Sequence, residues 1–440
     1  MNTKKLFEAA AKAGIAPFEM RKTTESKLQV ATFNDVVENY TVADNGSVKV
    51  RGLVDGKCGT FSSDCSEDSV IDVAIAAVKE SAEFGQPVDP AFFIKASDYK
   101  YEKVNTYNAA LAAVPASKYI DIAKTVARKA LSSDKRMESV QVQVEYSCGE
   151  TEFCNSNGLA LEDKANYCMI FASAKAVDGE NVESGEHYEI LTTLDGFDVD
   201  DFAAKLVDDT VGQLGGEVIK SGKYKVVYSQ DCVASLLSAV RDGFSAFNVE
   251  QHVSLLEGKV GQPVFSKLLT VEETPIGSDP FCSAFDDEGV ARTNKALIDK
   301  GVVTGYVYDL ATAARAGVKS TGNGRLEGGN VRPAVSYMTV KAGDGDLDKL
   351  FELVGDGIYI TGLGGVVTGL NPQSGDYSLQ ACGFVIEKGK KAKPVSLITV
   401  AGNIMTDFAD LGAVGNDMKL TYMGIKCPSV VVNSIAVSGK

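Results

Sequence analysis

Ser139-Val140-Gln141-Val142-Gln143-Val144-Glu145-Tyr146 is the stretch that decides the fold class of this chain, because apolar and polar residues alternate in it without interruption. Successive side chains of a β-strand point to opposite faces, so this alternation predicts a strand with one buried and one polar face. A second long strand is predicted over residues 167–176, beyond a turn at Asn157-Gly158. The first half of the chain therefore contains a sheet.

Helical periodicity lies on both sides of these strands. Apolar residues share one helical face from about Ser66 onward, again after Pro115, where Ser117 is the predicted N-cap, and a third time over residues 200–214. Nearer the N-terminus, Asn45-Gly46 and Asp55-Gly56 are predicted hairpin turns, since both residue pairs tolerate positive φ angles. Residues 1–220 are accordingly predicted to form an α+β domain of mixed sheet and helix.

The polar, glycine-rich stretch over residues 215–222 predicts a domain boundary, after which residues 224–228 begin a new strand. In the second half, helices fit residues 231–244 and 347–354. The remainder consists of short apolar runs separated by Gly, Asn and Asp, a pattern typical of a closed or barrel-like antiparallel sheet. Residues 221–440 are therefore predicted to form a glycine-rich, mostly antiparallel, barrel-like C-terminal domain.

Charge and composition argue against two classes of partner. The chain has 44 Lys and Arg against 59 Asp and Glu, a net charge of -15, whereas nucleic-acid binding requires a basic face that displaces counterions. The longest uncharged stretch, residues 358–375, is broken by glycines and by Asn371-Pro372, so no membrane span is predicted. Nine cysteines occur without a C-x-x-C pair, which favours free thiols in a reducing compartment. We expect a cytoplasmic protein that binds neither nucleic acid nor membrane.

No catalytic centre is evident from the residues alone. The two histidines, His187 and His252, are 65 positions apart, so no single helix presents both to one metal ion. The chain lacks a G-x-S-x-G nucleophile elbow and a G-x-x-x-x-G-K-[ST] phosphate-binding loop. A Cys–His pair with partners distant in sequence stays open as an alternative, because nine thiols are available.

Dense blocks of polar residues and glycine supply the remaining candidates, all in the second half. Taken alone, each block is typical of a turn in which an Asn or Asp side chain bonds its own backbone. They are also the candidates for residues that face a substrate or a partner. The residues are Asp286, Asp287, Glu288, Lys319, Ser320, Asn323, Asn371, Asp376, Asn403, Asn416 and Asp417.

The same blocks, in the same order, resemble the TldD/PmbA family, and specifically its PmbA branch, also called TldE. The resemblance covers nearly the whole chain and is most specific from Gly258 onward. It is carried by Gly258–Val264, Phe285–Val290, Gly301–Tyr306, Lys319–Gly324, Gly357–Thr361, Asn371-Pro372 with Gly375–Ser378, Ala381 and Gly383-Phe384, Pro394-Val395 with Ile398–Asn403, and Val414–Asp417, and more loosely by Arg51-Gly52, Gly59-Thr60 and Asn155–Gly158.

In that family the TldD branch carries a helical H-E-x-x-x-H zinc motif and a further cysteine ligand near the C-terminus, and the glutamate acts as general base on a metal-bound water. TldD and TldE pair to form a protease of unfolded peptides, including peptide-antibiotic precursors and an antitoxin. An older description is modulator of DNA gyrase. Aligned on its leucines, helix 235–243 of this chain places Ser238, Ala239 and Gly243 at the ligand and base positions, while Cys427 lies near the final strand.

None of these three residues offers the imidazole, thiolate or carboxylate lone pair that zinc requires. The resemblance therefore implies a PmbA/TldE-like, non-catalytic subunit that binds no metal itself, with zinc expected in a TldD-like paralogue as partner subunit. Its substrate would be an unfolded peptide, in peptide maturation or antitoxin degradation. Two alternatives stay open: a self-sufficient hydrolase with a cysteine or carboxylate centre, and a homodimeric peptide-binding protein.

Overall fold

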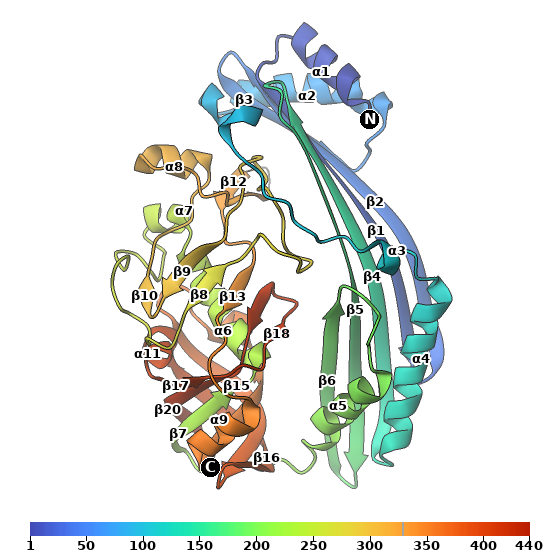
Figure 1. The fold of residues 1–440 in the computed structure, drawn as a ribbon, viewed down its shortest axis with the longest axis vertical. Helices are drawn as coiled ribbons and strands as arrows, with labels where there is room; N and C mark the ends of the chain where they lie inside the picture. The colour runs from blue at the N-terminus through green and yellow to red at the C-terminus, as the bar shows by residue number, and fades with distance from the viewer. Residues whose placement is uncertain (328–329) are drawn as a thin grey trace.

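Six antiparallel strands make up the sheet of the N-terminal half (Figure 1) in this computed structural model, which describes residues 1–327 and 330–440. Their spatial order is β3-β2-β1-β4-β5-β6. The two strands predicted over 139–146 and 167–176 lie inside β4 and β5, which pair along nearly their whole length. The bounds are β1 Phe18–Phe33, β2 Val36–Val54, β3 Lys57–Ser63, β4 Met137–Asn155, β5 Ala160–Asp178 and β6 Asn181–Leu191.

Helices cover one face of this sheet, as the alternation in β4 requires. Val140, Val142 and Val144 are at most 1% exposed and share a core with α4 and α5. Toward the other end of the same face, α1 and α2 pack over Met20 and Val48. The helices of this half are α1 Thr3–Lys12, α2 Ile71–Phe84, α3 Ala109–Ala112, α4 Ala116–Ser133 and α5 Val199–Val211, with 3-10 turns η1 Asp68–Val70, η2 Pro90–Phe92 and η3 Ala96–Asp98.

A closed five-stranded barrel forms the centre of the C-terminal half. The sheet order is β16-β15-β14-β7-β20-β17, and an additional pairing of β16 with β20 closes the ring. Its pairs are antiparallel except for β7 and β14, which run parallel. The barrel-like fold expected from the short apolar runs is therefore confirmed. The strands are β7 Gly222–Tyr228, β14 Gly357–Gly364, β15 Asp376–Glu387, β16 Lys390–Asn403, β17 Leu411–Val414 and β20 Val430–Ser438.

A second, smaller sheet of order β10-β9-β8-β13-β19-β18 lies beside the barrel, together with the hairpin β11–β12. Helix α6 belongs to the core that barrel and smaller sheet share: Leu237 and Val240 are fully buried in it. None of the helices in the described ranges is both long and apolar enough to span a bilayer. The remaining bounds are α6 Gln230–Gly243, α7 Ala246–Glu250, β8 Val271–Glu273, β9 Lys295–Asp299, β10 Val302–Val303, α8 Leu310–Ala316, β11 Gly324–Glu327, β12 Asn330–Pro333, β13 Met338–Val340, α9 Leu347–Val354, α10 Val366–Gly369, α11 Ile404–Ala409, β18 Lys419–Leu420 and β19 Ile425–Cys427.

Two local predictions are wrong. Asn45-Gly46 is not a turn, because both residues lie inside β2, where they pair with Glu25 and Thr24 of β1. The hairpin turns instead at Asn34, which has φ 53°. Ser117 is not an N-cap either: α4 begins at Ala116, so Ser117 is inside the helix.

The predicted turns at Asp55-Gly56 and Asn157-Gly158 are confirmed. Gly56 and Gly158 have φ of 78° and 84°, and the turns connect β2 to β3 and β4 to β5. Helix 347–354 is also confirmed with its predicted bounds.

Candidate functional site

Helix α6 holds the three positions that correspond to the zinc motif, and its surroundings are apolar. The Ser238 hydroxyl donates to the Ser235 carbonyl oxygen at 2.7 Å, within the helix itself. Ala239 is 8% exposed. A Cβ added at Gly243 would lie 3.1 Å from Cγ of Leu256, so this helix end is closely packed. These positions serve the packing of α6 and present no metal ligand.

Cys427 and the two histidines lie in different places. Cys427, in β19, is fully buried; its thiol donates to the Gln230 carbonyl oxygen at 3.2 Å, and burial raises its pKa. His187 lies on β6 with Nδ1 3.3 Å from Asp209, whereas the exposed His252 is 2.7 Å from Glu257. Within residues 1–327 and 330–440, no three side chains of His, Cys, Asp or Glu converge as a metal site would require.

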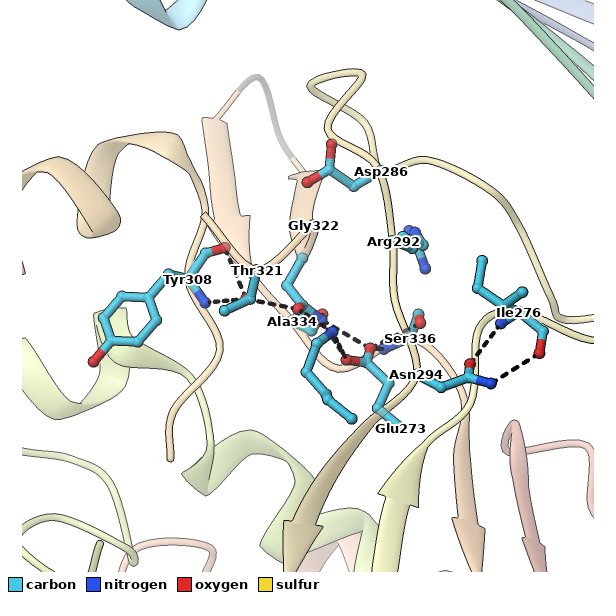
Figure 2. A network of polar contacts seen from close by, with 12 residues as sticks. Glu273, Ile276, Asp286, Arg292, Asn294, Tyr308, Thr321, Gly322, Ala334 and Ser336 are labelled. Carbon is cyan, nitrogen blue, oxygen red and sulfur yellow. Dashed lines mark hydrogen bonds and ion pairs between the residues drawn. The ribbon is translucent and has the colours of Figure 1, made fainter. Parts of the chain in front are cut away.

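A buried polar network lies beside the smaller sheet (Figure 2), centred on Glu273 at the end of β8. Glu273 has no exposed surface. Its Oε2 accepts a hydrogen bond from Lys295 Nζ at 2.7 Å, and Asn323 Nδ2 donates to both carboxylate oxygens at 2.8 and 3.0 Å. The backbone N–H and the hydroxyl of Ser336 complete the set at 2.7 and 2.8 Å. A charged carboxylate is thus fully satisfied inside the protein.

This network holds the loop of one predicted block in place. Asn323 Oδ1 accepts from Lys295 and from the hydroxyl of Thr321, and Thr321 Oγ1 in turn accepts from the backbone N–H of Tyr308 at 2.7 Å. Ser320 likewise donates to the Tyr308 carbonyl oxygen, whereas Lys319 is exposed. Asn323 therefore anchors the block, and Lys319 is the residue of this block that reaches the surface.

The acidic block Asp286-Asp287-Glu288 folds against the chain's own backbone. Asp286 Oδ1 accepts from the N–H groups of Glu288 and Val290 at 2.9 Å each, and its Oδ2 accepts from Gly324 N–H at 2.7 Å. Glu288 Oε2 accepts from the N–H of Leu310, at the start of α8. Asp286 and Glu288 are 1% and 2% exposed. Any role in facing a substrate or partner stays a prediction for these two residues.

The acidic block is also where the two halves of the chain meet. Arg21 of β1 forms an ion pair with Asp287, and Arg51 of β2 forms one with Glu19 of β1. Nη2 of Arg51 lies 3.9 Å from Glu288 Oε1. An apolar cluster of Ile94, Phe153, Leu159, Phe285 and Val290 lies at the same junction. Through these ion pairs and apolar contacts, the acidic block binds the polar face of the N-terminal sheet to the C-terminal half.

Burial raises the pKa values of three carboxyl groups at this junction. It raises the pKa of Asp286 to about 6, against the opposing charge of Arg292 and three backbone hydrogen bonds. Burial, together with the charge of Asp286, raises the pKa of Glu288 to about 8. The pKa of Glu19 is raised for the same reason, although Arg51 opposes the shift. Three carboxyl groups with perturbed pKa values in one place are a feature of functional sites and of structural ion-pair networks alike.

A second contact joins the two halves of the chain near the C-terminal end of β6, at Tyr188. The Tyr188 hydroxyl donates to Asp231 in the first turn of α6, and Lys419 donates to the same carboxylate at 2.8 Å. Lys419 also lies 3.9 Å from the centre of the Tyr188 ring, a cation–π arrangement. Tyr422 packs edge-on against Tyr188. Helix α6 is therefore held from its N-terminal end by the N-terminal sheet.

Three of the predicted residues come together at the mouth of the barrel. Asn403 Nδ2 donates to Asp376 Oδ1 and to the Ser374 carbonyl oxygen, both at 2.8 Å, and Asn371 Oδ1 accepts from the N–H groups of Gln373 and Ser374. Asn371 and Asp376 line a depression of about 530 Å³. This group is the one predicted set that lies together at an open surface.

The last predicted block, Asn416-Asp417, lies elsewhere. Asp417 accepts from the N–H and the hydroxyl of Ser429 and from Gln230 Nε2, while the side chain of Asn416 is exposed. Gln230 is the first residue of α6. Asp417 thus fixes the start of this helix, and the structure distributes the predicted residues over several sites.

Sequence reasoning missed the charged partners of these blocks. Glu273, Lys295, Arg21 and Arg51 belong to no motif, and the contacts of Glu273 come from residues 22 to 63 positions away. Strand alternation could have placed Arg21 and Arg51 on the polar face of the sheet, but it could not have paired them with the acidic block.

Seven of the nine thiols show no sign of activation. Burial raises the pKa of seven cysteines, which disfavours the nucleophilic thiolate. These are Cys58, Cys154, Cys168, Cys232, Cys282, Cys382 and Cys427.

Comparison with known families gives consistent matches over most of the chain. Residues 221–439 match the PmbA/TldA metallopeptidase C-terminal domain, and residues 110–214 match the PmbA/TldA metallopeptidase central domain. Metalloprotease PmbA of Escherichia coli O157:H7 is 24% identical, and the alignment covers 98% of this chain and 94% of that protein.

Solved structures agree with this architecture. A Thermotoga maritima protein described as a modulator of a DNA gyrase superimposes with a TM-score of 0.90 at 27% identity, over 99% of both chains. TldE from Thermococcus kodakarensis also gives a TM-score of 0.90 over 99% of both chains, but at 20% identity, so this second similarity concerns the fold.

Proposed function

Because the chain belongs to the PmbA/TldD metallopeptidase family, we propose that it is a PmbA/TldE-like partner subunit that carries no catalytic residues itself. A zinc-bearing, TldD-like paralogue supplies the metal and the scissile chemistry. The pair cleaves unfolded peptides, in peptide maturation or antitoxin degradation. This chain supplies part of the wall against which the peptide lies.

The observation that supports this role most directly is the chemistry of α6. Ser238, Ala239 and Gly243 occupy the positions of the H-E-x-x-x-H motif. The Ser238 hydroxyl bonds within the helix, Ala239 offers only a buried methyl group, and Gly243 has no side chain. Zinc requires imidazole, thiolate or carboxylate donors, so the residues present do not fit the ion. Between Ala239 and Gly243 the ionisable residues are Arg241 and Asp242, and Arg241 donates to the Met423 carbonyl oxygen at 2.9 Å. No proton transfer or metal-assisted step is assigned to this helix.

The surface of the C-terminal half offers groups suited to a peptide or a partner subunit. Asn371 and Asp376 present an amide and a carboxylate to the depression of about 530 Å³, Asn403 donates to Asp376 beside it, and Lys319 and Asn416 are exposed on other loops. An extended peptide that adds as a strand to a sheet edge gains backbone hydrogen bonds and needs few specific side-chain contacts. Such binding suits a protease with unfolded substrates.

A reducing compartment, the cytoplasm, is the proposed location. All nine cysteines carry free thiols, and four of them are buried. A chain of 440 residues with this number of thiols would be expected to contain disulfides if it folded in an oxidising compartment.

The test is the cleavage of an unstructured peptide by this chain alone, by its TldD-like paralogue from the same genome alone, and by the mixture. We expect cleavage that a chelator abolishes, and only in the mixture. Cleavage by this chain alone would overturn the proposal and favour a self-sufficient hydrolase. Binding of the peptide by a homodimer of this chain, with no cleavage in the mixture, would instead favour a peptide-binding protein.

Ser238 provides a sharper variant for the same assay. Its hydroxyl bonds only within α6, so Ser238→Ala is expected to leave the turnover of the mixture within about twofold of the wild-type value. A loss of turnover of about a hundredfold, with the two chains still associated, would show that the hydroxyl takes part in the reaction.

A further inference from the structure

Helix α5 packs against β6 (Figure 1), and His187 of β6 lies in the contact between them. Its ring stands edge-on to the ring of Phe202 in α5, with 4.9 Å between the ring centres, and only 14% of its side chain is exposed. It pairs across from Ala172, a residue of the core under α4 and α5. Histidine changes its charge between about pH 5 and 8, so a largely buried histidine at such a contact can make the contact depend on pH.

Two carboxylates flank the imidazole, one from each element. Asp209 of α5 lies 3.3 Å from Nδ1, and Glu189 of β6 lies 3.8 Å from Nε2. Nε2 is buried, and within residues 1–327 and 330–440 no group is hydrogen-bonded to it. The acidic side chains are 47% and 30% exposed, so each carboxylate has room to turn toward the ring. A neutral imidazole carries a proton on one nitrogen only, whereas an imidazolium carries one on each and can donate to both carboxylates.

Lys205 and Lys419 are cations near His187. Lys205 of α5 lies 2.7 Å from Asp201 and 3.9 Å from Glu189, so it neutralises part of the acidic charge. Lys419 of β18 acts from the C-terminal half, and its charge disfavours protonation of the imidazole. Strand β5 adds no charge, because its residues on this face are apolar: Ile170, Ala172 and Ala174.

The two acids outweigh the opposing effects. Burial lowers the pKa of His187, and so does the charge of Lys419, but Asp209 and Glu189 raise it, and the net shift is upward from the ordinary 6.5. The position of the ring between two carboxylates therefore favours its protonated form. Protonation of His187 and the contact of α5 with β6 thus stabilise each other.

Helix α5 also connects the N-terminal half to the barrel. Its Asp208 forms an ion pair with Lys391 of β16 at 2.7 Å, and this ammonium lies 4.6 Å from the ring centre of Phe384 in β15. Gly212, directly after α5, is so close to the same ring that an added Cβ would lie 3.4 Å from it. The helix is in contact with β6 and with the barrel, so a change in one contact bears on the other.

The neighbouring residue connects the same strand to α6. Tyr188 points to the opposite face of β6 and donates to Asp231 in the first turn of α6. We propose that His187 is a pH switch between β6 and α5. Protonated, it donates to Asp209 and Glu189 together and holds α5 on the sheet; neutral, it donates to one of them, and α5 is held less firmly. The switch is independent of the proposed function, since it concerns this chain alone.

The direction of the pH response follows from the raised pKa. The ordinary value of 6.5 applies to His187 in the unfolded chain, and the folded value is higher. The stabilising contribution of His187 is therefore complete below pH 6.5 and is lost as the pH rises through the folded-state pKa. We expect α5 to be held most firmly in mildly acidic solution and less firmly in mildly alkaline solution.

NMR titration tests the ionisation of His187. The chain has only two histidines, so both rings can be followed in protein labelled at histidine. We expect a pKa above 6.5 for His187, and a lower one in Asp209→Asn and in Glu189→Gln, which keep the size of each side chain and remove its charge. His252, 80% exposed in the C-terminal half, is the internal control, and its titration curve should be the same in all three proteins.

Hydrogen–deuterium exchange tests the effect on α5. After correction for the intrinsic pH dependence of exchange, we expect the amides of Val199–Val211 to exchange about fivefold faster at about pH 8 than at about pH 6. In His187→Gln, which keeps a polar side chain without a titrating group, this difference should disappear. His252→Gln is the matched control and should retain it. Helix α2, at the other end of the sheet, should show no difference that depends on His187.

Three results would overturn the proposal: a pKa of His187 at or below 6.5 in the folded chain, a pH response of α5 that persists in His187→Gln, or one that disappears in Glu288→Gln. In the last case the response would come from the acidic block, where burial raises the pKa of Glu288 to about 8. Should His187→Gln fail to fold, Asp209→Asn takes its place and is expected to reduce the pH response of α5.

Discussion

At the scale of the residue, Glu273 is expected to be the most sensitive acid of the C-terminal half. It is fully buried, and Lys295, Asn323 and Ser336 all donate to it. Glu273→Ala removes the counter-charge of the Lys295 ammonium, which keeps only the Asn323 amide oxygen as acceptor, and leaves Asn323 Nδ2 only the Ala334 carbonyl oxygen. We therefore expect a loss of about 3–5 kcal/mol in the free energy of unfolding, measured in urea.

Glu352→Ala is the control for this prediction. Glu352 also accepts from a lysine, Lys349, but both side chains are more than half exposed. Exposed pairs contribute little, so the urea midpoint of this variant should stay close to that of the wild type. A Glu273→Ala variant as stable as Glu352→Ala would show that the network is not what holds these loops.

Glu288 gives the fold a pH dependence whose sign is unusual for an acid. Burial and the charge of Asp286 raise its pKa to about 8 from an ordinary 4.5. Between these values the folded chain binds more protons than the unfolded one, so stability falls as the pH rises through this window. We expect the Tm to fall from about pH 5 to about pH 8, and Glu288→Gln, which keeps an acceptor for Leu310, to reduce that fall.

Asp348→Asn serves as the comparison, because Asp348 is an exposed acid in the first turn of α9. Its Tm profile should follow that of the wild type. If Glu288→Gln were to retain the full pH dependence, the titrating group would have to be sought in Asp286 or Glu19, the other two carboxyls of the junction with raised pKa values.

These residues also show how far sequence reasoning extends to a site. The blocks themselves could be predicted, because runs of Asp, Asn and Gly are recognisable in any sequence. The contacts of these blocks could not be predicted. Asp287 pairs with Arg21, a residue 266 positions away, because the two halves of the chain pack together, and no local sequence pattern describes that packing. Asp286 and Glu288 are consequently buried at a junction, a position that their polarity alone would not suggest.

At the scale of the element, the barrel depends on Gly383 of β15. A Cβ at this position would lie 1.9 Å from the Tyr359 carbonyl oxygen of the neighbouring β14, and a backbone atom cannot move aside. Gly383→Ala is therefore expected to destabilise the fold by about 3 kcal/mol or more, measured by urea unfolding.

Gly305→Ala is the matched control, since nothing lies within 4 Å of its added Cβ. This variant should be neutral or slightly more stable, because alanine restricts the unfolded chain. Equal effects of the two substitutions would mean that β14 and β15 can separate without loss, in contradiction to a closed barrel.

Regular elements were the most predictable part of the fold. Helix 347–354 and the alternation in β4 depend on apolar patterns within a few residues, and both are confirmed. Asn45-Gly46 shows the limit: the pair favours a turn locally, but nineteen residues of β2 gain more by continuing along β1. The closed ring of β7, β14, β15, β16 and β20 joins segments from both ends of the C-terminal half, so its pairing order lies outside any local pattern.

At the scale of the whole molecule, Arg51 is the cation that makes the junction of the two halves stable. It lies between Glu19 on the N-terminal sheet and Glu288 of the acidic block, and its pKa is raised by these two carboxylates in spite of burial. Its side chain also covers the ring of Phe93, 5.1 Å from the ring centre. Arg51→Met keeps much of this apolar contact and removes the charge.

The expected effect of Arg51→Met depends on pH. Near pH 5 the raised pKa of Glu288, about 8, lets this group take up a proton, so the junction should tolerate the loss of the guanidinium. Near pH 8 Glu288 would have to ionise without a counter-charge, and separation of the two halves then costs less free energy than burial of the unpaired charge. We expect the radius of gyration, measured by small-angle X-ray scattering, to be larger at about pH 8 than at about pH 5 in this variant only.

Two comparisons separate this response from general unfolding. Arg128→Met removes an exposed guanidinium on α4 that lies 4.0 Å from Asp35, and it should leave the radius of gyration unchanged at either pH. Arg51→Met combined with Glu288→Gln removes the group that ionises in this pH range and should stay compact to higher pH than Arg51→Met alone. A radius that does not change with pH in Arg51→Met would mean that the apolar cluster around Phe153 and Phe285 holds the halves together by itself.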